Sequence, residues 1–266
     1  MLTRVRETII SRKNRRITDA CALFDRKERK RTGLFAFEGI KLFDEAKKTG
    51  LIFDSVFVTG SALEKYDGSL CAVDCVYAVT DEVYDKLTGE NAPQGVFSVC
   101  RIPESRTPDI DDCKCVILLD GVADPGNLGT IIRCADAFGI GHVFISSDGV
   151  DLYSPKTVRA CMGSLFRVGT TVVTDVCDTV RSLQSHGFGV YAAVLSPDAK
   201  SITDMTYPGR IAFVVGNEGH GVSAPVSAAC DGRVIIPMCG GAESLNASVA
   251  ASILMWEGAK AAKLIK

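Results

Sequence analysis

The sequence predicts an α/β protein of two domains, with a mostly parallel sheet in the second domain. Short strands and helices alternate over residues 34–100, as in a small α/β domain. A polar segment with two prolines, residues 101–112, follows and is the predicted linker. Beyond it, runs such as CVILLD are apolar throughout, which is typical of parallel strands covered on both faces. We therefore place the domains at 1–100 and 113–266.

The first domain begins with a segment that reads as helical. Val5, Ile9 and Ile10 recur near helical spacing among charged residues, and Gly33 ends the stretch. A short strand, a turn and an amphipathic helix that stops at Gly50 come next. Further strands are predicted at FDSVFVTG, CVYAVT and GVFSVCRI, with a short helix at DEVYDKLTG.

The second domain repeats apolar strands and helices. Besides CVILLD, we predict strands at HVFISS, RVGTTVV, GVYAAVL, RIAFVVG and RVIIP, and helices at NLGTIIRCADAFG and DVCDTVRSLQSHG. The final helix, from about Asn246 to Lys263, is apolar on nearly every side, so it needs burial on more than one face. It packs either inside the domain or against a second subunit, and we favour the second subunit.

The composition excludes several classes of protein. The hydrophobic fraction of 47% is enough for a packed core. No apolar run approaches the roughly 18–20 residues that span a bilayer, and the N-terminus is no secretory signal, so we expect a soluble, cytoplasmic protein. Eleven scattered cysteines without a CxxC pair, and only three histidines, indicate no metal site.

The charge is distributed unevenly. A net charge of −2 argues against a uniformly basic nucleic-acid binder. Residues 1–33, however, hold eleven Lys/Arg and four Asp/Glu, a net of +7, which leaves −9 for the remainder. Such a basic arm predicts a polyanionic partner met through one end, although a solvated charged helix would look the same. The predicted RNA contacts in this arm are Arg12, Lys13, Arg15 and Arg16.

Three loops rich in glycine and asparagine follow strands of the second domain: DGVADPGNLG, GNEGHGVS and PMCGGAESLN. In an open parallel sheet, ligands bind beyond the carboxyl ends of the strands, and glycine lets the backbone approach them closely. Gly121 and Gly126 have the spacing of a phosphate loop, but Asn127 and Leu128 replace its lysine and hydroxyl residue. The dinucleotide fingerprint GxGxxG is absent as well, so the loops point away from ATP and NAD.

These loops resemble the three motifs of the SpoU/TrmH-like RNA ribose 2′-O-methyltransferase family of the SPOUT superfamily. Asn127 and Arg133 match the first motif, residues 216–219 the second, and residues 244–247 the third. RTGLFAFEGIKLFDEA and APQGVFSV resemble the family's N-terminal substrate-binding domain, which is similar to ribosomal L30e. The resemblance covers nearly the whole chain.

The resemblance implies a deep trefoil knot in the C-terminal domain and a homodimer with the active site at its interface. S-adenosylmethionine, the methyl donor, would bind in the knot. The positions implied around it are Leu195, Gly216, Asn217, Ile236, Met238 and Leu245.

The resemblance also implies the catalytic set. An arginine stays protonated, so we expect Arg133 to clamp a phosphate and stabilise the developing alkoxide rather than act as a simple base. Asn127 and Glu218 would orient Arg133 or the substrate, and Ser244 and Asn246 would position the substrate. Helix capping is the alternative role for Asn127, Ser244 and Asn246.

The expected function is methylation of a ribose 2′-hydroxyl in RNA. The separate N-terminal domain favours ribosomal RNA over transfer RNA. A non-catalytic RNA-binding protein on the same fold is the competing class, and intact residues at every motif position argue against it. A Rossmann-type methyltransferase would need a glycine-rich first loop that this sequence lacks.

Overall fold

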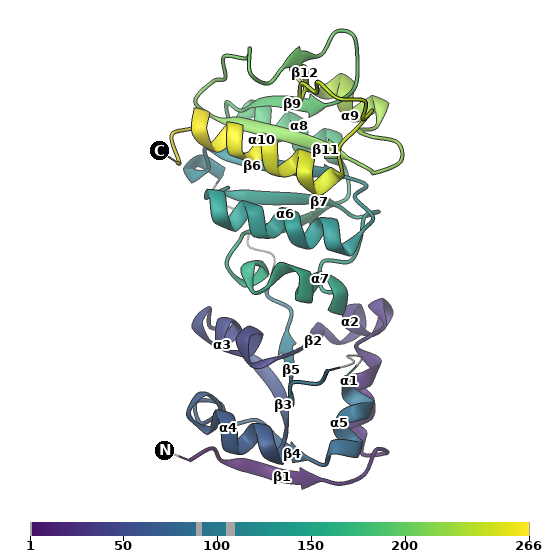
Figure 1. The fold of residues 1–266 in the computed structure, drawn as a ribbon, viewed down its shortest axis with the longest axis vertical. Coiled ribbons are helices and arrows are strands. Elements are labelled where there is room, and N and C mark those ends of the chain that lie inside the picture. Colours follow the sequence, from purple (N-terminus) through teal and green to yellow (C-terminus); the bar gives the residue numbers. More distant parts are fainter. Residues whose placement is uncertain (1, 89–91, 105–109, 266) are drawn as a thin grey trace. The chain divides into compact units, whose positions relative to one another are not determined.

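The computed structural model describes residues 2–88, 92–104 and 110–265, and the chain forms two compact units. Unit 1 comprises Met1–Glu104 and Asp151–Phe166, and unit 2 comprises Ser105–Val150 and Arg167–Lys266. Both units are α/β, and the sheet of unit 2 is parallel, which confirms the predicted fold class (Figure 1). The implied knot stays a prediction.

Unit 1 is built on a five-stranded sheet in the order β1-β4-β3-β5-β2. Strand β5 runs antiparallel to its neighbours β3 and β2, whereas β1, β4 and β3 run parallel to one another. The strands are β1 (Val5–Ile9), β2 (Leu34–Glu38), β3 (Phe53–Thr59), β4 (Val76–Val79) and β5 (Val96–Arg101).

Helices cover both faces of this sheet. Helices α1 (Arg15–Ala22) and α5 (Asp81–Leu87) pack over one face, around the buried Phe57. Helices α3 (Ile40–Lys48) and α4 (Gly60–Leu70) pack over the other. Helices α2 (Arg26–Thr32) and α7 (Pro155–Cys161) lie against β2.

The segment Asp151–Phe166 lies in the predicted second domain but packs with unit 1. The ring centroid of Phe35 is 4.9 Å from that of Tyr153 and 6.2 Å from that of Phe166. Apolar contact between aromatic rings therefore holds this segment on β2. The domain borders themselves stay a prediction, and the predicted linker falls partly on residues 105–109, outside the described residues.

The helix predicted over residues 1–33 is wrong, because the segment forms a strand and two helices. Strand β1 pairs with β4, a partner some seventy residues away. The side chain of Asn14 accepts from Arg16 N and starts α1, and that of Asp25 accepts from Lys27 N and starts α2. The basic segment is therefore built into unit 1 and is not a free arm.

Unit 2 contains a seven-stranded parallel sheet in the order β10-β12-β9-β11-β6-β7-β8. The six predicted apolar strands are all present, and β10 is an additional short one. The strands are β6 (Cys115–Asp120), β7 (His142–Ser146), β8 (Thr170–Val173), β9 (Gly189–Ala193), β10 (Lys200–Ser201), β11 (Ile211–Gly216) and β12 (Gly232–Ile235).

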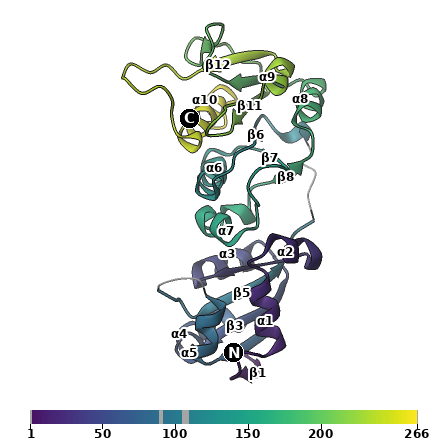
Figure 2. The same ribbon diagram turned by 90° about the vertical axis from the view of Figure 1, so that its right-hand side faces the viewer.

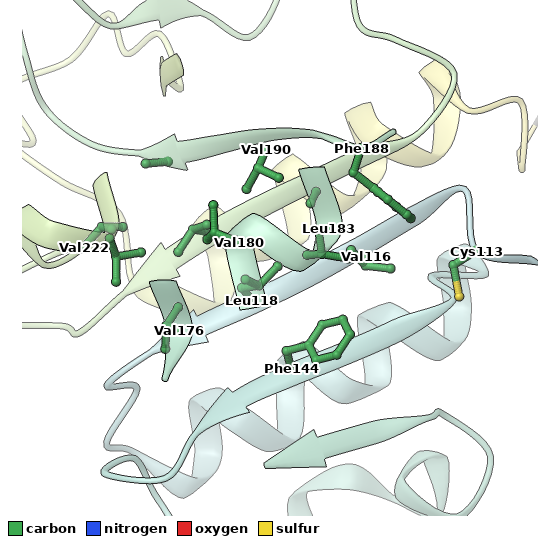
Figure 3. Close-up of a cluster of buried hydrophobic side chains, with 14 residues drawn as sticks. Cys113, Val116, Leu118, Phe144, Val176, Val180, Leu183, Phe188, Val190 and Val222 are labelled. Carbon is green, nitrogen blue, oxygen red and sulfur yellow. The ribbon is translucent and has the colours of Figure 1, made fainter. Parts of the chain in front are cut away.

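Two helix layers enclose this sheet. Helices α6 (Pro125–Phe138) and α10 (Ala247–Ala261) cover one face, and α8 (Val176–Ser185) and α9 (Ala224–Ala229) the other (Figure 2). Val116 and Leu118 of β6 point toward α8 and pack there in the main buried cluster (Figure 3). Two 3₁₀ turns, Ile110–Asp112 and Ser164–Phe166, complete the secondary structure.

Helix α10 is apolar on most sides mainly because it packs inside unit 2, against α6, β11 and β6. Ala251, Leu254 and Met255 are fully buried there. Packing inside the domain therefore accounts for one face of the helix. Val249 and Trp256 remain exposed on another face, and packing of that face against a second subunit stays a prediction.

Neither a membrane-spanning helix nor a metal cluster occurs in the described part of the chain. No helix there is long and apolar enough to cross a bilayer. No group of three or more His, Cys, Asp or Glu side chains is placed to hold a metal ion among the same residues.

Close packing of α10 on the sheet generates a testable prediction at Gly258. A Cβ at this position would lie 2.7 Å from Cys115 Sγ and 2.9 Å from Phe213 Cε2. Overpacking costs about 1–3 kcal/mol, and the higher helix propensity of alanine offsets about 1 kcal/mol of it. We therefore expect Gly258→Ala to lower the free energy of unfolding by up to roughly 2 kcal/mol in denaturant titrations.

Gly68→Ala in α4 is the matched control, because no heavy atom lies within 4 Å of the added Cβ. This variant should be as stable as the wild type or more stable by up to about 1 kcal/mol. Equal destabilisation by both substitutions would contradict the close approach.

Candidate functional site

A cavity of about 520 Å³ lies at the carboxyl edge of the unit 2 sheet. Strands β9, β11 and β12 end at this edge, and because they are parallel, the loops that follow them line the cavity together. The structure brings all six residues predicted around the cofactor to the wall of this cavity: Leu195, Gly216, Asn217, Ile236, Met238 and Leu245.

Gly216 allows the backbone to fold closely at the cavity wall. A Cβ at this position would lie 2.0 Å from the carbonyl carbon of Gly221 and 2.1 Å from Val222 N. Asn217 and Gly221 exchange two backbone hydrogen bonds, of 3.0 and 2.9 Å, which close the turn between them. No other residue fits at position 216 without moving this turn.

The lining of the cavity fits S-adenosylmethionine. Ile236, Met238 and Leu245 offer apolar surface for a purine ring, and the neighbouring loops offer backbone hydrogen-bonding groups. Among the described residues that line it there is no lysine or arginine, and Glu218 is the one carboxylate. A wall without cations disfavours phosphates and accepts a positively charged sulfonium.

A chain of side-chain hydrogen bonds ties the three loops together. Asn127 Nδ2 donates to Glu218 Oε1 at 2.7 Å, and Asn246 Nδ2 donates to Asn127 Oδ1 at 3.0 Å. Each residue comes from a different loop, so the chain fixes the loops relative to one another. We refer to these three residues as the Asn–Glu–Asn network.

Glu218 also holds the start of α6. Its carboxylate accepts hydrogen bonds from Ala123 N at 3.2 Å and from Asp124 N at 3.3 Å. Partial burial raises the pKa of Glu218, but the hydrogen bonds from Asn127 and from these backbone groups outweigh it. The pKa of Glu218 therefore lies below its usual value, and the group is an anion at neutral pH.

Asn246 and Ser244 differ in what their side chains do. Asn246 Oδ1 accepts from Ser248 N at 2.9 Å and from Val249 N at 3.3 Å, which caps α10. Ser244 lines the cavity and is exposed, and its hydroxyl has no hydrogen bond within the described ranges. Asn246 is thus engaged in structure, whereas Ser244 is available to a ligand.

Arg133 lies on α6 away from the Asn–Glu–Asn network. Its side chain is exposed, and no hydrogen bond or ion pair joins it to any residue that the structure describes. Asn127, six residues earlier on the same helix, is only 8% exposed. Glu218 therefore bonds to Asn127 and to the loop before α6, and it makes no direct contact that would orient Arg133.

The side chain of Asn217 shapes the loops from within. Its Nδ2 donates to Gly121 O at 2.7 Å, and its Oδ1 accepts from Gly219 N at 2.8 Å. Both ends of the amide are therefore occupied. A contact between Asn217 and a cofactor would come from its backbone.

Two residues that support the loops were missed in the sequence. Asp120 Oδ2 accepts from Ser223 N at 2.8 Å, and Ser146 Oγ accepts from Gly121 N at 2.8 Å. Each is the polar last residue of its strand, β6 or β7. That position, at the carboxyl end of a parallel strand, was the signal that could have identified them.

The lowered pKa of Glu218 gives a pH-dependent prediction. The stabilisation is complete above the pKa of an unfolded glutamate, about 4.3, and is lost as the pH falls through the lower folded-state value. The difference in Tm between the wild type and Glu218→Gln should therefore be largest near neutral pH and should shrink toward pH 3. Thermal melts across this range measure it.

Glu243→Gln provides the control, because Glu243 is exposed in the third loop and has no hydrogen bond or ion pair with a described residue. This variant should follow the wild type at every pH. A constant offset between wild type and Glu218→Gln would show that the carboxylate makes no ionic contribution.

Comparison with known proteins identifies the family. The model of the SpoU rRNA Methylase family matches residues 114–256, and that of the MRM3-like substrate binding domain matches residues 14–98. The chain is 34% identical over 248 residues to the 23S rRNA (guanosine(2553)-2′-O)-methyltransferase RlmP of Bacillus subtilis, covering 93% of this chain and 97% of that protein.

Solved structures agree over nearly the full length. An AdoMet-bound rRNA methyltransferase from Sinorhizobium meliloti has a TM-score of 0.83 at 28% identity, covering 95% of this chain and 97% of that one. The SpoU methyltransferase AviRb from Streptomyces viridochromogenes, in complex with AdoMet, has a TM-score of 0.83 at 28% identity, covering 93% and 98%. The Asn–Glu–Asn network ties the three motif loops together, and the second and third of them line the cavity. This chain belongs to the SpoU rRNA methylase family.

Proposed function

We propose that this protein transfers a methyl group from S-adenosylmethionine to a ribose 2′-hydroxyl in ribosomal RNA. The carrying observation is a cavity that the second and third motif loops line, with no lysine or arginine among its described lining residues. The Asn–Glu–Asn network ties the first motif loop to the other two. The Bacillus subtilis relative, which carries the name of a 23S rRNA 2′-O-methyltransferase, supports the same reaction and favours the large ribosomal subunit as the source of the substrate. With such a substrate, the protein would work in the cytoplasm.

The reaction is an in-line displacement. The donor supplies a methyl group that is activated by a positively charged sulfur. A bond forms between the hydroxyl oxygen and the methyl carbon while the carbon–sulfur bond breaks, and the hydroxyl proton leaves. The protein must therefore align the ribose and help a weakly acidic hydroxyl lose its proton.

Arg133 suits this second task. Its guanidinium stays charged and has no partner within the described chain, so it is free to hold the phosphate beside the target ribose. Asp136, one turn further along α6, is engaged by Arg167 Nη2 at 2.6 Å and does not neutralise Arg133. The charge of Arg133 then stabilises the developing alkoxide, and the proton passes to phosphate or water.

Ser244 and the Asn–Glu–Asn network have different parts in this proposal. The free hydroxyl of Ser244 at the cavity wall would position the ribose. Asn127, Glu218 and Asn246 would act as positioning residues, because their polar groups are already used to hold the three loops and the start of α6.

We further propose that the working form is a homodimer. Val249, Ile253 and Trp256 are spaced four and three residues apart on α10, which places them on one side of the helix. Val249 and Trp256 are 46% and 45% exposed, and Ile253 is partly exposed. The Trp256 ring meets the Phe138 ring edge-on at 5.5 Å, which extends the apolar stripe onto α6.

Arg12, Lys13, Arg15 and Arg16 remain proposed RNA contacts. The Arg15 side chain is 93% exposed, and its ion pair with Asp19, at 3.6 Å, is weak in water. Lys86 Nζ donates to Arg12 O at 2.7 Å and so holds the turn that presents this segment. The charges therefore stand on a fixed scaffold and remain accessible to phosphate.

The direct test is methyl transfer from labelled S-adenosylmethionine. Transcripts of 23S rRNA should become labelled. The phosphodiester that follows the labelled nucleotide should resist alkaline hydrolysis, because a 2′-O-methyl group removes the hydroxyl that attacks it. Transfer RNA should stay unlabelled. Labelling of transfer RNA alone would favour the other substrate class, and donor binding without labelling of any RNA would favour a binding protein.

Arg133→Ala should lower the single-turnover rate of methylation by at least about 10²-fold, the usual loss when one charge-stabilising donor is removed. Donor affinity, measured by calorimetry, should stay within about twofold of the wild type because the residue does not line the cavity. Arg133→Lys should restore little of the methylation rate, because an ammonium group cannot reproduce the planar, two-pronged contact of a guanidinium with a phosphate.

Arg181→Ala is the matched control, because Arg181 is an exposed arginine on α8, on the opposite face of the sheet. Its rate should equal that of the wild type. An Arg133→Ala rate within threefold of the wild type would remove Arg133 from the reaction.

Val249→Glu should produce monomers in sedimentation experiments, because the carboxylate would be buried without a partner at the proposed interface. Val172→Glu is the control, since Val172 is 51% exposed on β8, at the edge of the sheet. It should leave the dimer intact. A wild-type protein that is monomeric and active at working concentration would refute the proposed dimer.

A further inference from the structure

The positive charge of residues 1–33 does not lie only at Arg12–Arg16: five of its cations are on α2, and the segment that contains α7 adds two more. Residues 25–33 and 151–166 together hold seven Lys/Arg against three Asp/Glu, a net of +4 in a chain of net −2. Both views show α2 and α7 side by side (Figures 1 and 2). We call this the α2–α7 surface, with its exposed cations Arg26, Lys27, Lys30, Arg31, Lys156 and Arg159.

A buried ion pair fixes the two parts of this surface. Arg29 is 4% exposed, and its Nη2 donates to Asp151 Oδ2 at 2.7 Å. Its Nη1 donates to Leu23 O at 2.6 Å. A buried charge is costly without such partners, and breaking the pair from one side would be strongly destabilising. The pair therefore holds α2 and the start of the α7 segment in one arrangement.

The acidic groups of this surface are already occupied. Glu28 pairs with Arg31 at 2.8 Å, Asp25 caps α2, and Asp151 takes the buried arginine. The ammonium groups of Lys27, Lys30 and Lys156 have no hydrogen bond or ion pair with any residue in the described ranges. Three cations thus stand exposed on this surface without a counter-charge among the described residues.

We propose that the α2–α7 surface binds the phosphate backbone of the RNA substrate. The inference rests on the proposed function and adds a second contact surface to the segment of Arg12–Arg16. Exposed lysines suit phosphates, because an ammonium group can donate to a phosphate oxygen from many directions. Such contacts do not distinguish one base from another. Lys156 belongs in sequence to the methylase match at 114–256 but stands on unit 1, so the RNA-holding surface draws on both parts of the sequence.

The surface is tested by the triple variant Lys27→Gln, Lys30→Gln and Lys156→Gln in the full-length protein. Glutamine removes the charges while it keeps the helix propensity and the Arg29–Asp151 pair. Each lost phosphate contact lowers the log–log salt slope of RNA binding by about 0.7–0.9, so the slope should fall by roughly 2. Affinity for a 23S rRNA transcript near 0.1 M salt should drop on the order of tenfold to hundredfold.

The matched control is Lys114→Gln, Lys200→Gln and Lys263→Gln, which removes the same charge from three exposed lysines of unit 2. Its salt slope should equal that of the wild type. In methylation assays the α2–α7 variant should raise KM for RNA and leave kcat and donor affinity unchanged, because no substituted residue lines the cavity. Reversal of Arg12, Lys13, Arg15 and Arg16 to Glu should lower the slope independently, so that the two losses add.

A triple variant with the wild-type slope, or with a loss no larger than that of the control, would overturn the inference. That failure is distinct from failure of the proposed function. If the protein binds RNA through this surface but methylates none, the surface stands and the function falls. If it methylates ribosomal RNA with an unchanged slope in the variant, the function stands and the surface falls.

Discussion

The hydrogen bond from Asn127 to Glu218 joins two loops that are 91 residues apart in the chain, and the site depends on it. Parallel strands bring the loops to one edge of the sheet, but glycine-rich loops have many conformations that such an edge would allow. The carboxylate of Glu218 selects one of them, since it binds the Asn127 amide and the backbone at the start of α6 together. Asn246 adds the third loop and, with the same side chain, begins α10.

Secondary structure was predicted correctly where a local sequence pattern determines it. The prediction failed where contact with a residue far away in the sequence determines the structure. CVILLD is apolar at five successive positions, and β6 has the predicted bounds because only a strand covered on both faces uses such a run. The strand VRETI has no such run, and its pairing with β4 makes it a strand. The segment after Val150 likewise packs with unit 1, because the rings of Tyr153 and Phe166 contact the ring of Phe35. No local sequence pattern predicts such a contact.

The site shows the same division. The resemblance to the family implied which residues surround the cavity, and the structure places all of them in its wall. The hydrogen bonds between the side chains of the site could not be predicted from the sequence motifs. Asn127 and Arg133 are six residues apart on α6, and at 3.6 residues per turn they point to different sides of the helix. Glu218 bonds to the buried Asn127, so a single motif contains one residue that holds the loops and another, Arg133, that is exposed and has no partner among the described residues.

A charged donor and a polyanionic substrate make opposite electrostatic demands, and this chain meets them in different places. A sulfonium is disfavoured near cations. The described residues that line the cavity include no lysine or arginine, and Glu218 is their one carboxylate. Phosphates need cations that are not already neutralised, and the proposed α2–α7 surface carries such cations, while Asp25, Glu28 and Asp151 are used in a helix cap and ion pairs. In the proposed mechanism Arg133 is the exception, because the alkoxide forms where the two ligands meet. Arg133 lies on α6, outside the cavity lining, so the proposed charge for the substrate would not stand beside the donor.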